Sequence, residues 1–439
     1  MEPWKVITQL LGLQSVTFTS VKLFRKSLTA VFHCEYRSDG YGCSKCGQAM
    51  TGIHDWQERR MSGPPMGVFS KVHLHLKIPR GYCPTHGASL ARVPFVHTKF
   101  KSMTCGLVEV AGRLMEELSC AGAGRILHQN AKKLWSADQY RMRFMMSRFK
   151  LPEDLDLSYL SADEVHHRTF RDPTQQKLVR KRDIQFVTNL VSHKDGKVIF
   201  NAKGRDKPAL EACLSVLSPG QRMAVEHFAV DMHDPFIAAA KAKCPNAEVS
   251  VDRFHLVQQV NRRFDEVRRL EFKQAQARKD TFTEGMLSPA RRFVLMERDK
   301  HLTKHEFKML RRLRDINTNI SNAMLLVENF HVIMDRRTVD GFRKGLCEWY
   351  QMVRESKLKP FLDLCKLIRK YRRNIEAYIT SRLTTAVSEG LNNAIKTLKK
   401  ASYGLPRVES FRLKIMQRHG YLNHRNINTD DLLFNMPNP

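Results

Sequence analysis

The sequence predicts a multidomain α+β protein. Three observations lead to this fold class: two pairs of metal-ligand residues near the amino terminus, a central region of alternating strand-like and helix-like segments, and a long helical stretch after it. A chain of 439 residues is long enough for several domains, each with its own apolar core. Hydrophobic residues make up 42% of the chain, which is typical of a globular protein.

The first element is a predicted zinc ribbon. Cys43 and Cys46 lie in "GCSKCG", and Cys83 and His86 lie in "GYCPTHG", next to Gly and Pro residues that permit tight turns. Two such pairs provide the Cys₃His ligand set of a closed structural Zn²⁺ site. The segment "KVHLHLKIPRGYC" alternates as a strand would and leads into the second pair. The alternative is a set of free thiols with a surface histidine.

The second element is a predicted helix-turn-helix over residues 104–148. Three helical segments follow one another there, and a basic helix over 132–146 is the candidate recognition element. A plain linker bundle is the alternative, because any three-helix bundle has this pattern. The residues predicted to contact DNA phosphates or bases are Lys132, Lys133, Arg141 and Arg143.

The third element is a mixed sheet flanked by helices, which the alternating pattern from about residue 158 predicts. "DIQFVTNLVS" and "KVIFNAKG" flank an Asp-Gly turn and form a predicted hairpin. Asp163, Asp231 and Asp252 each follow a strand-like run, and ligands bind at such strand ends. A single aspartate there is more often a helix cap or turn residue. Together, however, Asp163 and Asp231 in a basic chain are better interpreted as oxygen ligands of Mg²⁺.

The chain is strongly basic, with 74 Lys and Arg against 44 Asp and Glu and a net charge of +30. Such a charge attracts nucleic acids or anionic membranes. Nucleic acid is favoured because no single basic amphipathic helix dominates; a ribosomal-type protein is an alternative, although such proteins are usually shorter. The sequence has no apolar run of 18 residues and no secretory signal, so we expect an intracellular protein with reduced cysteines.

Several strings in combination resemble a known family. "SADEVHHR", "DMHDPF", "VDRFH" and "SEGLNNAIK" with "YG" downstream resemble bacterial insertion-sequence DDE transposases of the ISL-three type, which carry an amino-terminal zinc ribbon and helix-turn-helix. The resemblance covers nearly the whole chain and implies a ribonuclease-H-like mixed-sheet core with a helical insertion. It implies a catalytic triad of Asp163, Asp231 and Glu389 that holds two Mg²⁺ or Mn²⁺ ions.

The resemblance also indicates roles for other residues. Asp252 matches a family motif outside the triad, and we expect it to support the sheet end or to contact DNA. His166 and His167 depart from the family pattern and are expected to face DNA or the core. Beyond Glu389, basic residues could hold flanking phosphates, and two asparagines could contact DNA, with capping or packing as an equal alternative. These residues are Asn392, Asn393, Lys396, Lys399 and Lys400.

The implied domain order has five parts. They are a zinc-ribbon DNA-binding domain (1–98), a helix-turn-helix domain (99–155), the first part of the catalytic core (156–262), a helical insertion (263–380), and the last part of the core with the glutamate helix and tail (381–439).

The resemblance predicts a transposase that binds terminal inverted repeats, cleaves DNA by two-metal hydrolysis and joins 3′-hydroxyl ends to target DNA. Its partner is double-stranded DNA, and a homodimer is expected because two ends are joined in concert. We expect a cytoplasmic bacterial protein, associated with the nucleoid when bound to DNA. The alternatives are a non-catalytic repressor and a junction-resolving nuclease on the same fold.

Overall fold

The computed structural model of the chain describes residues 3–97, 99–169, 184–289, 303–402, 405 and 407–422. The chain forms two compact units. One consists of residues 1–154 and 395–439, and the other of residues 155–394. The last predicted domain, residues 381–439, is therefore divided between the two units.

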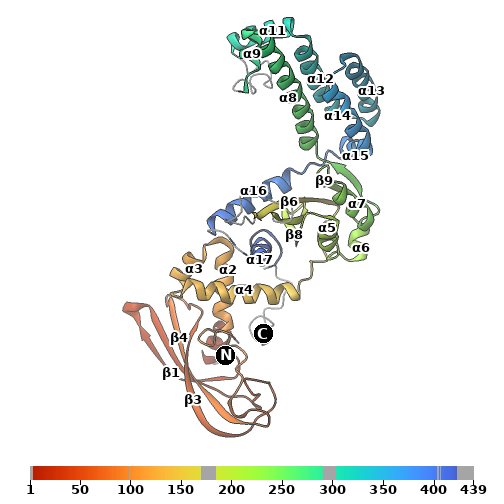
Figure 1. Ribbon diagram of the computed structural model, residues 1–439. Helices are drawn as coiled ribbons and strands as arrows, with labels where there is room; N and C mark the ends of the chain where they lie inside the picture. Colours follow the sequence, from red (N-terminus) through yellow and green to blue (C-terminus); the bar gives the residue numbers. More distant parts are fainter. Residues whose placement is uncertain are drawn as a thin grey trace. The chain divides into compact units, whose positions relative to one another are not determined.

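The first unit begins with a five-stranded sheet (Figure 1). Its elements are α1 (Pro3–Leu10), β1 (Val16–Phe24), β2 (Thr29–Tyr36), β3 (Thr51–Gly63), β4 (Lys71–Cys83) and β5 (Gly87–Leu90). The strand order is β1-β2-β4-β3, with β5 paired to β4; β2 and β4 are parallel and the other pairs are antiparallel. Burial alternates along β2 and at the start of β4, as expected for strands with one face in the core. The strand predicted to lead into the second ligand pair is β4.

Four further helices lie wholly within this unit. They are α2 (Cys105–Glu117), α3 (Cys120–Ile126), α4 (Ala131–Ser147) and α17 (Val408–His419). The side chains of Thr104, Ser119 and Asn130 cap the first three helices by accepting hydrogen bonds from backbone N–H groups of the first turn. The three helices predicted over 104–148 are thus present, and α17 packs against α2 and α4.

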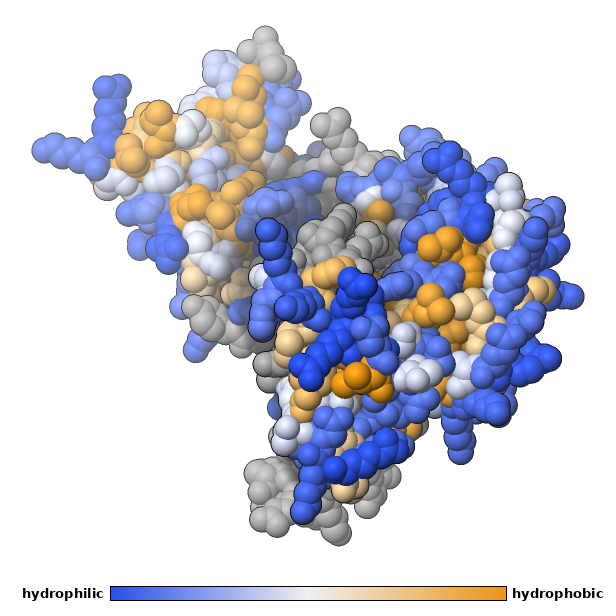
Figure 2. Space-filling model, turned by 90° about the horizontal axis from the view of Figure 1, so that it is seen from above, coloured by the Kyte–Doolittle hydropathy of each residue, from blue (hydrophilic) through white to orange (hydrophobic). Residues whose placement is uncertain are grey.

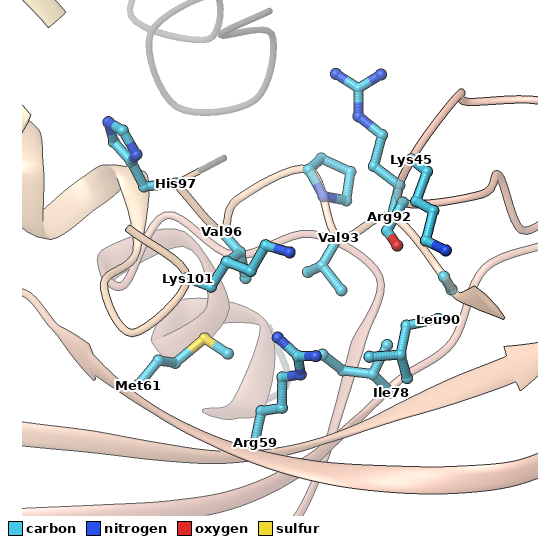
Figure 3. Close-up of a pocket in the computed structure, with 13 residues that line it drawn as sticks. Lys45, Arg59, Met61, Ile78, Leu90, Arg92, Val93, Val96, His97 and Lys101 are labelled. Atoms are coloured by element: carbon cyan, nitrogen blue, oxygen red, sulfur yellow. The ribbon is translucent and has the colours of Figure 1, made fainter. Parts of the chain in front are cut away.

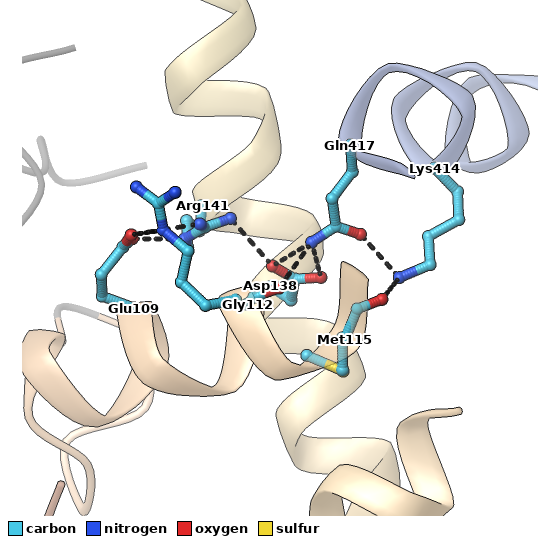
Figure 4. Close-up of polar contacts among 8 residues, drawn as sticks. Glu109, Gly112, Met115, Asp138, Arg141, Lys414 and Gln417 are labelled. Atoms are coloured by element: carbon cyan, nitrogen blue, oxygen red, sulfur yellow. Dashed lines mark hydrogen bonds and ion pairs between the residues drawn. The ribbon is translucent and has the colours of Figure 1, made fainter. Parts of the chain in front are cut away.

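Helices α2, α4 and α17 enclose a buried polar cluster around Arg141 (Figure 4). Arg141 is 0% exposed, and its guanidinium lies 2.6 Å from Glu109 and 3.2 Å from Asp138. Gln417 donates a hydrogen bond of 3.0 Å to Asp138, and Lys414 donates one of 2.6 Å to Gln417. The DNA contact predicted for Arg141 is wrong, because this side chain is buried and paired within the protein. The cluster is also one reason why residues 395–439 belong with the amino-terminal unit.

The second unit contains a mixed five-stranded sheet. Its strands are β6 (Tyr159–Thr169), β7 (Ile184–Ser192), β8 (Lys197–Lys203), β9 (His227–Val230) and β10 (Glu248–Val251), in the order β10-β9-β6-β7-β8. The pairs β6–β7 and β7–β8 are antiparallel, which confirms the predicted hairpin, whereas β9 and β10 run parallel to β6. The carboxyl ends of β6, β9 and β10 therefore point toward one edge of the sheet.

Short helices join these strands. They are α5 (Lys207–Leu214), α6 (Pro219–Met223) and α7 (Asp234–Lys243), which lie together beside the sheet in Figure 1. Helix α5 packs against β7, β8 and α7, while α7 contacts β9 and β10. Asp206 caps α5 by accepting a hydrogen bond of 3.1 Å from the backbone of Ala209. The predicted alternation of strands and helices is thus confirmed.

A long helical segment separates β10 from the end of this unit. Its described helices are α8 (Arg253–Arg278), α9 (Thr281–Leu287), α11 (Lys304–Ile316), α12 (Thr318–Met334), α13 (Val339–Ser356), α14 (Lys359–Lys370), α15 (Arg372–Ser381) and α16 (Ala386–Ala401). Helices α8, α12, α13 and α14 run side by side (Figure 1). Trp349 is fully buried there and donates a hydrogen bond of 2.8 Å to the carbonyl of Leu326.

The surface seen in Figure 2 is mainly hydrophilic, with hydrophobic side chains in smaller groups between charged ones. Within the described ranges, no helix is both long and apolar enough to cross a membrane.

Candidate functional site

Two of the predicted acids meet at the carboxyl edge of the second sheet. Asp163 follows Ala162, the last residue of β6 that pairs with β9, and Asp231 directly follows β9. Burial and, to a lesser degree, the nearby charge of Asp231 together raise the pKa of Asp163 to about 7. The side chain of Asn392 donates a hydrogen bond of 2.5 Å to Asp163 Oδ2, and the backbone of Glu164 donates one of 2.7 Å to Oδ1.

A histidine that the sequence did not single out stands beside the second acid. His255, in the first turn of α8, places Nε2 2.9 Å from Asp231 Oδ1. This contact with Asp231 raises the pKa of the imidazole, although burial acts in the opposite direction. The contact is not aligned as a hydrogen bond, and Asp231 Oδ1 is a buried oxygen without a hydrogen-bond donor in the described part of the chain. The string "VDRFH" contains this histidine three residues after Asp252 and could have drawn attention to it.

The third predicted acid lies on a helix that reaches the same edge. Ser388 on α16 shares a hydrogen bond of 2.5 Å with Ser161 on β6, and Asn392 contacts Asp163. Glu389 is three residues before Asn392, a spacing that places both on one side of the helix. The Glu389 side chain is exposed, however, and it forms no three-residue ligand group with the two aspartates among the described residues. The structure thus brings the helix of Glu389 to Asp163 and leaves the Glu389 side chain exposed.

Asp252 connects the end of β10 to two helices. Its Oδ1 accepts a hydrogen bond of 2.8 Å from the backbone of Phe254 and so caps α8. Its Oδ2 accepts hydrogen bonds from the backbone N–H of Thr385, at 3.1 Å, and from the Thr385 hydroxyl, directly before α16. Asp252 is 3% exposed. Of its two predicted roles, the structure supports the structural one at the sheet end.

The remaining sequence candidates of this unit are placed as follows. His167 is buried with Nδ1 3.2 Å from the side-chain oxygen of Gln185, whereas His166 is exposed beside the ring of Phe186. The DNA contact predicted for Asn392 is wrong, because this side chain is 6% exposed and bonded to Asp163; the packing alternative is confirmed. Asn393 is exposed.

The basic candidates differ in exposure. Lys132 and Arg143 on α4 are exposed, whereas Lys133 is half-buried and donates a hydrogen bond to the Ser102 hydroxyl. On α16, Lys396 and Lys400 are exposed, and burial lowers the pKa of Lys399. The DNA contacts of these six residues and of Asn393 remain predictions.

The candidate zinc ligands converge in the first unit. The ligand atoms of Cys43, Cys46, Cys83 and His86 all lie within 4.8 Å of one another. The thiols of Cys46 and Cys83 are 3.5 Å apart, although 36 residues separate them in the sequence. Among the described residues this is the one such group of three or more His, Cys, Asp or Glu. Three sulfurs and one imidazole nitrogen are a typical structural Zn²⁺ ligand set.

Local backbone geometry shapes this ligand group. Gly47 and Gly87 follow the two ligand pairs with φ of +78° and +63°, values that favour glycine, and Gly47 N–H donates a hydrogen bond of 2.8 Å to the carbonyl of Cys43. Burial raises the pKa of the Cys43 thiol, but backbone N–H groups of Cys46 and Lys45 more than offset this and lower it to about 6. The surroundings of Cys43 therefore favour its thiolate form, the form that metals bind.

Comparisons with known proteins identify the family of this chain. A family model described as a transposase, of the ISL3-type DDE group, matches residues 176–415. The transposase for insertion sequence element IS1001 of Bordetella parapertussis is 23% identical over 376 residues, covering 85% of this chain and 87% of that protein. The transposase for insertion sequence element IS1557 of Mycobacterium tuberculosis is 22% identical over 404 residues, covering 82% of each.

Among solved structures, a chain of the Drosophila P element transposase strand transfer complex matches with a TM-score of 0.36 and 12% identity. The match covers 75% of this chain and 93% of that chain, but the likeness is too weak to support an argument about the fold. The family match spans more than half of the sequence. The chain belongs to the ISL3-type family of insertion-sequence DDE transposases.

Proposed function

We propose that this chain cleaves the ends of an insertion sequence in a metal-dependent reaction and joins their 3′-hydroxyl groups to target DNA. The observation that carries the proposal is the acid pair at the sheet edge. Two carboxylates lie close enough there to interact electrostatically, one with a pKa of about 7 and the other with a buried oxygen that lacks a hydrogen-bond donor among the described residues. Such a pair is poorly balanced without a cation.

The proposed core is ribonuclease-H-like. Support comes from the sheet of the second unit, in which three antiparallel strands, β6 to β8, are extended by two strands parallel to β6. In this arrangement the first strand of the sheet lies at its centre and carries Asp163, and its parallel neighbour delivers Asp231 to the same edge. Helix α16, which follows the long helical segment, returns to this sheet edge. It therefore carries the proposed third ligand, Glu389, toward the two aspartates.

Asp163, Asp231 and Glu389 are the proposed ligands of two divalent cations, Mg²⁺ or Mn²⁺. Bound cations of this kind activate an attacking oxygen and stabilise the leaving oxygen of a phosphodiester. The neighbouring residues have positioning roles: Asn392 holds the orientation of Asp163, and His255 offsets the charge of Asp231. Glu389 is exposed on the side of α16 that Asn392 shares, so a change of side-chain rotamer is the proposed route by which it joins the pair.

The Cys₃His group is the proposed structural zinc site. Bound there, Zn²⁺ would link the loop of Cys43 and Cys46 to the end of β4 and stabilise the fold of the first unit. This unit, with its exposed Lys132 and Arg143, is the proposed reader of the terminal inverted repeats. Two DNA ends have to be joined in concert, so we propose that the active species is at least a homodimer.

The central test is a cleavage and strand-transfer assay on DNA that carries the element's ends, in the presence of Mg²⁺. Asp231→Asn and Glu389→Gln should each abolish cleavage and leave DNA binding within about twofold of wild type. Glu348→Gln, a neutralised exposed glutamate on α13, is the matched control and should cleave normally.

Three results would count against the proposal. Full cleavage by Asp231→Asn would remove the acid pair from the mechanism. DNA binding without any cleavage by the wild-type protein would favour a repressor. Cleavage of four-way junctions without strand transfer would favour a junction-resolving nuclease.

A further inference from the structure

The first unit contains a pocket of about 400 Å³ that none of the proposed functions uses (Figure 3). It lies between strands β3 and β4 on one side and the chain that runs from the end of β5 toward α2 on the other. Four basic side chains line it, and they come from separate segments of the sequence. They are Lys45, Arg59, Arg92 and Lys101.

The four cations lack acidic partners within the described ranges. No ion pair or side-chain hydrogen bond joins any of them to an Asp or Glu, and no acidic residue lines the pocket. Some basic residues elsewhere in this sheet region are neutralised: Arg80 pairs with Asp55 at 2.6 Å and Arg37 with Glu35 at 2.8 Å. Four unneutralised cations around one cavity repel one another, and an anion relieves that repulsion.

The inner wall of the pocket is partly apolar. Met61, Ile78 and Val93 line it and are at most 8% exposed. Arg59 lies two residues before Met61 on β3, so both side chains are on the same face of the strand. In Figure 3 the side chains of Arg59 and Lys101 extend over Met61 toward the same space. An inorganic anion would leave this apolar surface uncovered, whereas a ligand with a charged end and a flat apolar part would cover both.

The candidate zinc site shapes one wall. Lys45 lies between Cys43 and Cys46, and backbone hydrogen bonds tie this loop to the opposite wall: Ser44 N–H donates to Leu90 at 3.0 Å, and Arg92 N–H donates to Gly42 at 2.7 Å. The loop therefore fixes the distance between Lys45 and Arg92. The pocket is preformed, since its two sides belong to one hydrogen-bonded framework.

We propose that this pocket binds an unpaired nucleotide of DNA, with the phosphate between the basic side chains and the base against the apolar part of the inner wall. A double helix presents its phosphates on a convex surface with the bases stacked inside, so it cannot place a base in a cavity of this size. A single strand exposes both parts, and proteins bind it through basic grooves and apolar or stacking contacts. The inference rests on the proposed action on DNA ends and adds single-stranded DNA to the ligands of the first unit.

The test is fluorescence anisotropy with the full-length protein, the Arg59→Gln/Lys101→Gln double variant and a control. The control is Lys22→Gln/Lys26→Gln, which removes two basic residues from the same unit outside the pocket lining. The probes are a blunt duplex, the same duplex with a short single-stranded tail, and a single strand. The pocket variant should lose about tenfold in affinity for the single strand and the tailed duplex, and its salt-dependence slope for the single strand should fall by about 1.4.

For the blunt duplex, the pocket variant and the control variant should lose the same amount of affinity. An equal loss of the pocket variant on all three probes would overturn the proposal in favour of a duplex-backbone contact. If the pocket variant bound the single strand as tightly as wild type, the pocket would be excluded as a nucleotide-binding site. Lys45→Gln/Arg92→Gln repeats the test with two exposed side chains, so that a folding defect of one variant does not decide the outcome.

The proposed catalytic function is tested separately from the proposed nucleotide pocket. Asp231→Asn should retain single-strand binding while it loses cleavage. Loss of cleavage in the pocket variant alone, with normal binding of all three probes, would contradict the nucleotide pocket without touching the acid pair.

Discussion

The raised pKa of Asp163 makes the acid pair a source of instability that a single substitution should remove. The group titrates at about 7 in the folded chain and near 3.8 without these surroundings. Between these two pH values the folded state holds a proton that the unfolded chain releases, so stability falls as the pH rises and levels off above 7. At about 1.4 kcal/mol per pKa unit, the penalty is at most about 4 kcal/mol at pH 8 and about 2 kcal/mol at pH 5.

Asp163→Asn cannot ionise and keeps an oxygen that can accept the hydrogen bond of Asn392. In metal-free buffer the variant should therefore be more stable than wild type, with a larger difference at pH 8 than at pH 5. Hydrogen exchange measured by mass spectrometry on peptides of β6 reports this directly: 4 kcal/mol corresponds to about a thousandfold slower exchange at most. Added Mg²⁺ should slow exchange in wild type and leave the variant unchanged.

The control is Asp39→Asn, an exposed aspartate in the first unit, which should leave β6 exchange unaltered. A variant that is no more protected than wild type at pH 8, or that gains equally at both pH values, would refute the reasoning. The first outcome would mean that Asp163 is already ionised without a penalty. The second would mean that the gain arises from packing rather than from charge.

Three further predictions concern other parts of the chain. Gly112→Ala should destabilise α2 by about 3 kcal/mol in hydrogen exchange, because its Cβ would lie 2.5 Å from the buried, ion-paired Arg141 guanidinium. Gly285→Ala is the contrasting substitution: its Cβ would meet nothing within 4 Å, and it should stabilise α9 by about 0.5–1 kcal/mol. Thr385→Val should remove the hydroxyl group that donates a hydrogen bond to buried Asp252. The variant should lose about 2 kcal/mol of protection from hydrogen exchange at the start of α16 and should cleave DNA more slowly. Unchanged hydrogen exchange there would contradict the structural role of Asp252. A strong chelator should release about one zinc per chain and expose β1 to β5 to protease, as metal analysis and proteolysis would show; a protein that stays resistant without zinc would contradict the structural site.

Local patterns predicted the features whose geometry is set locally. The zinc ligands lie in two short turns, and the alternation of β4 indicated how the second turn is reached. Asp163 and Asp231 could be placed at one edge because each follows an apolar run, although only Asp231 ends a strand: β6 continues past Asp163 to Thr169 in its pairing with β7. The hairpin of β7 and β8 followed from its Asp-Gly turn.

Contacts between distant segments could not be predicted in this way. His255 reaches Asp231 only through the angle at which α8 leaves the sheet, and the pairing of α17 with α2 and α4 has no local signal. Arg141 did carry a signal that basic composition obscured: it lies seven residues after Leu134 and four before Met145, both buried, which places it on the apolar side of α4. Position on the helix was more informative than charge.

Helices α16 and α17 come late in the chain, and this affects when the two units can complete their folding during synthesis. The first unit needs α17, and the acid pair needs α16, so the ribosome must translate nearly the whole chain before either is finished. A product that stops before Thr385 contains both aspartates and all four zinc ligands, yet it leaves Asp252 without its hydrogen-bond donors from Thr385. We expect such fragments to stay partly unfolded and to be degraded, because chains fold as complete units and exposed intermediates are removed. Late completion therefore leaves an unfinished chain without a complete acid site.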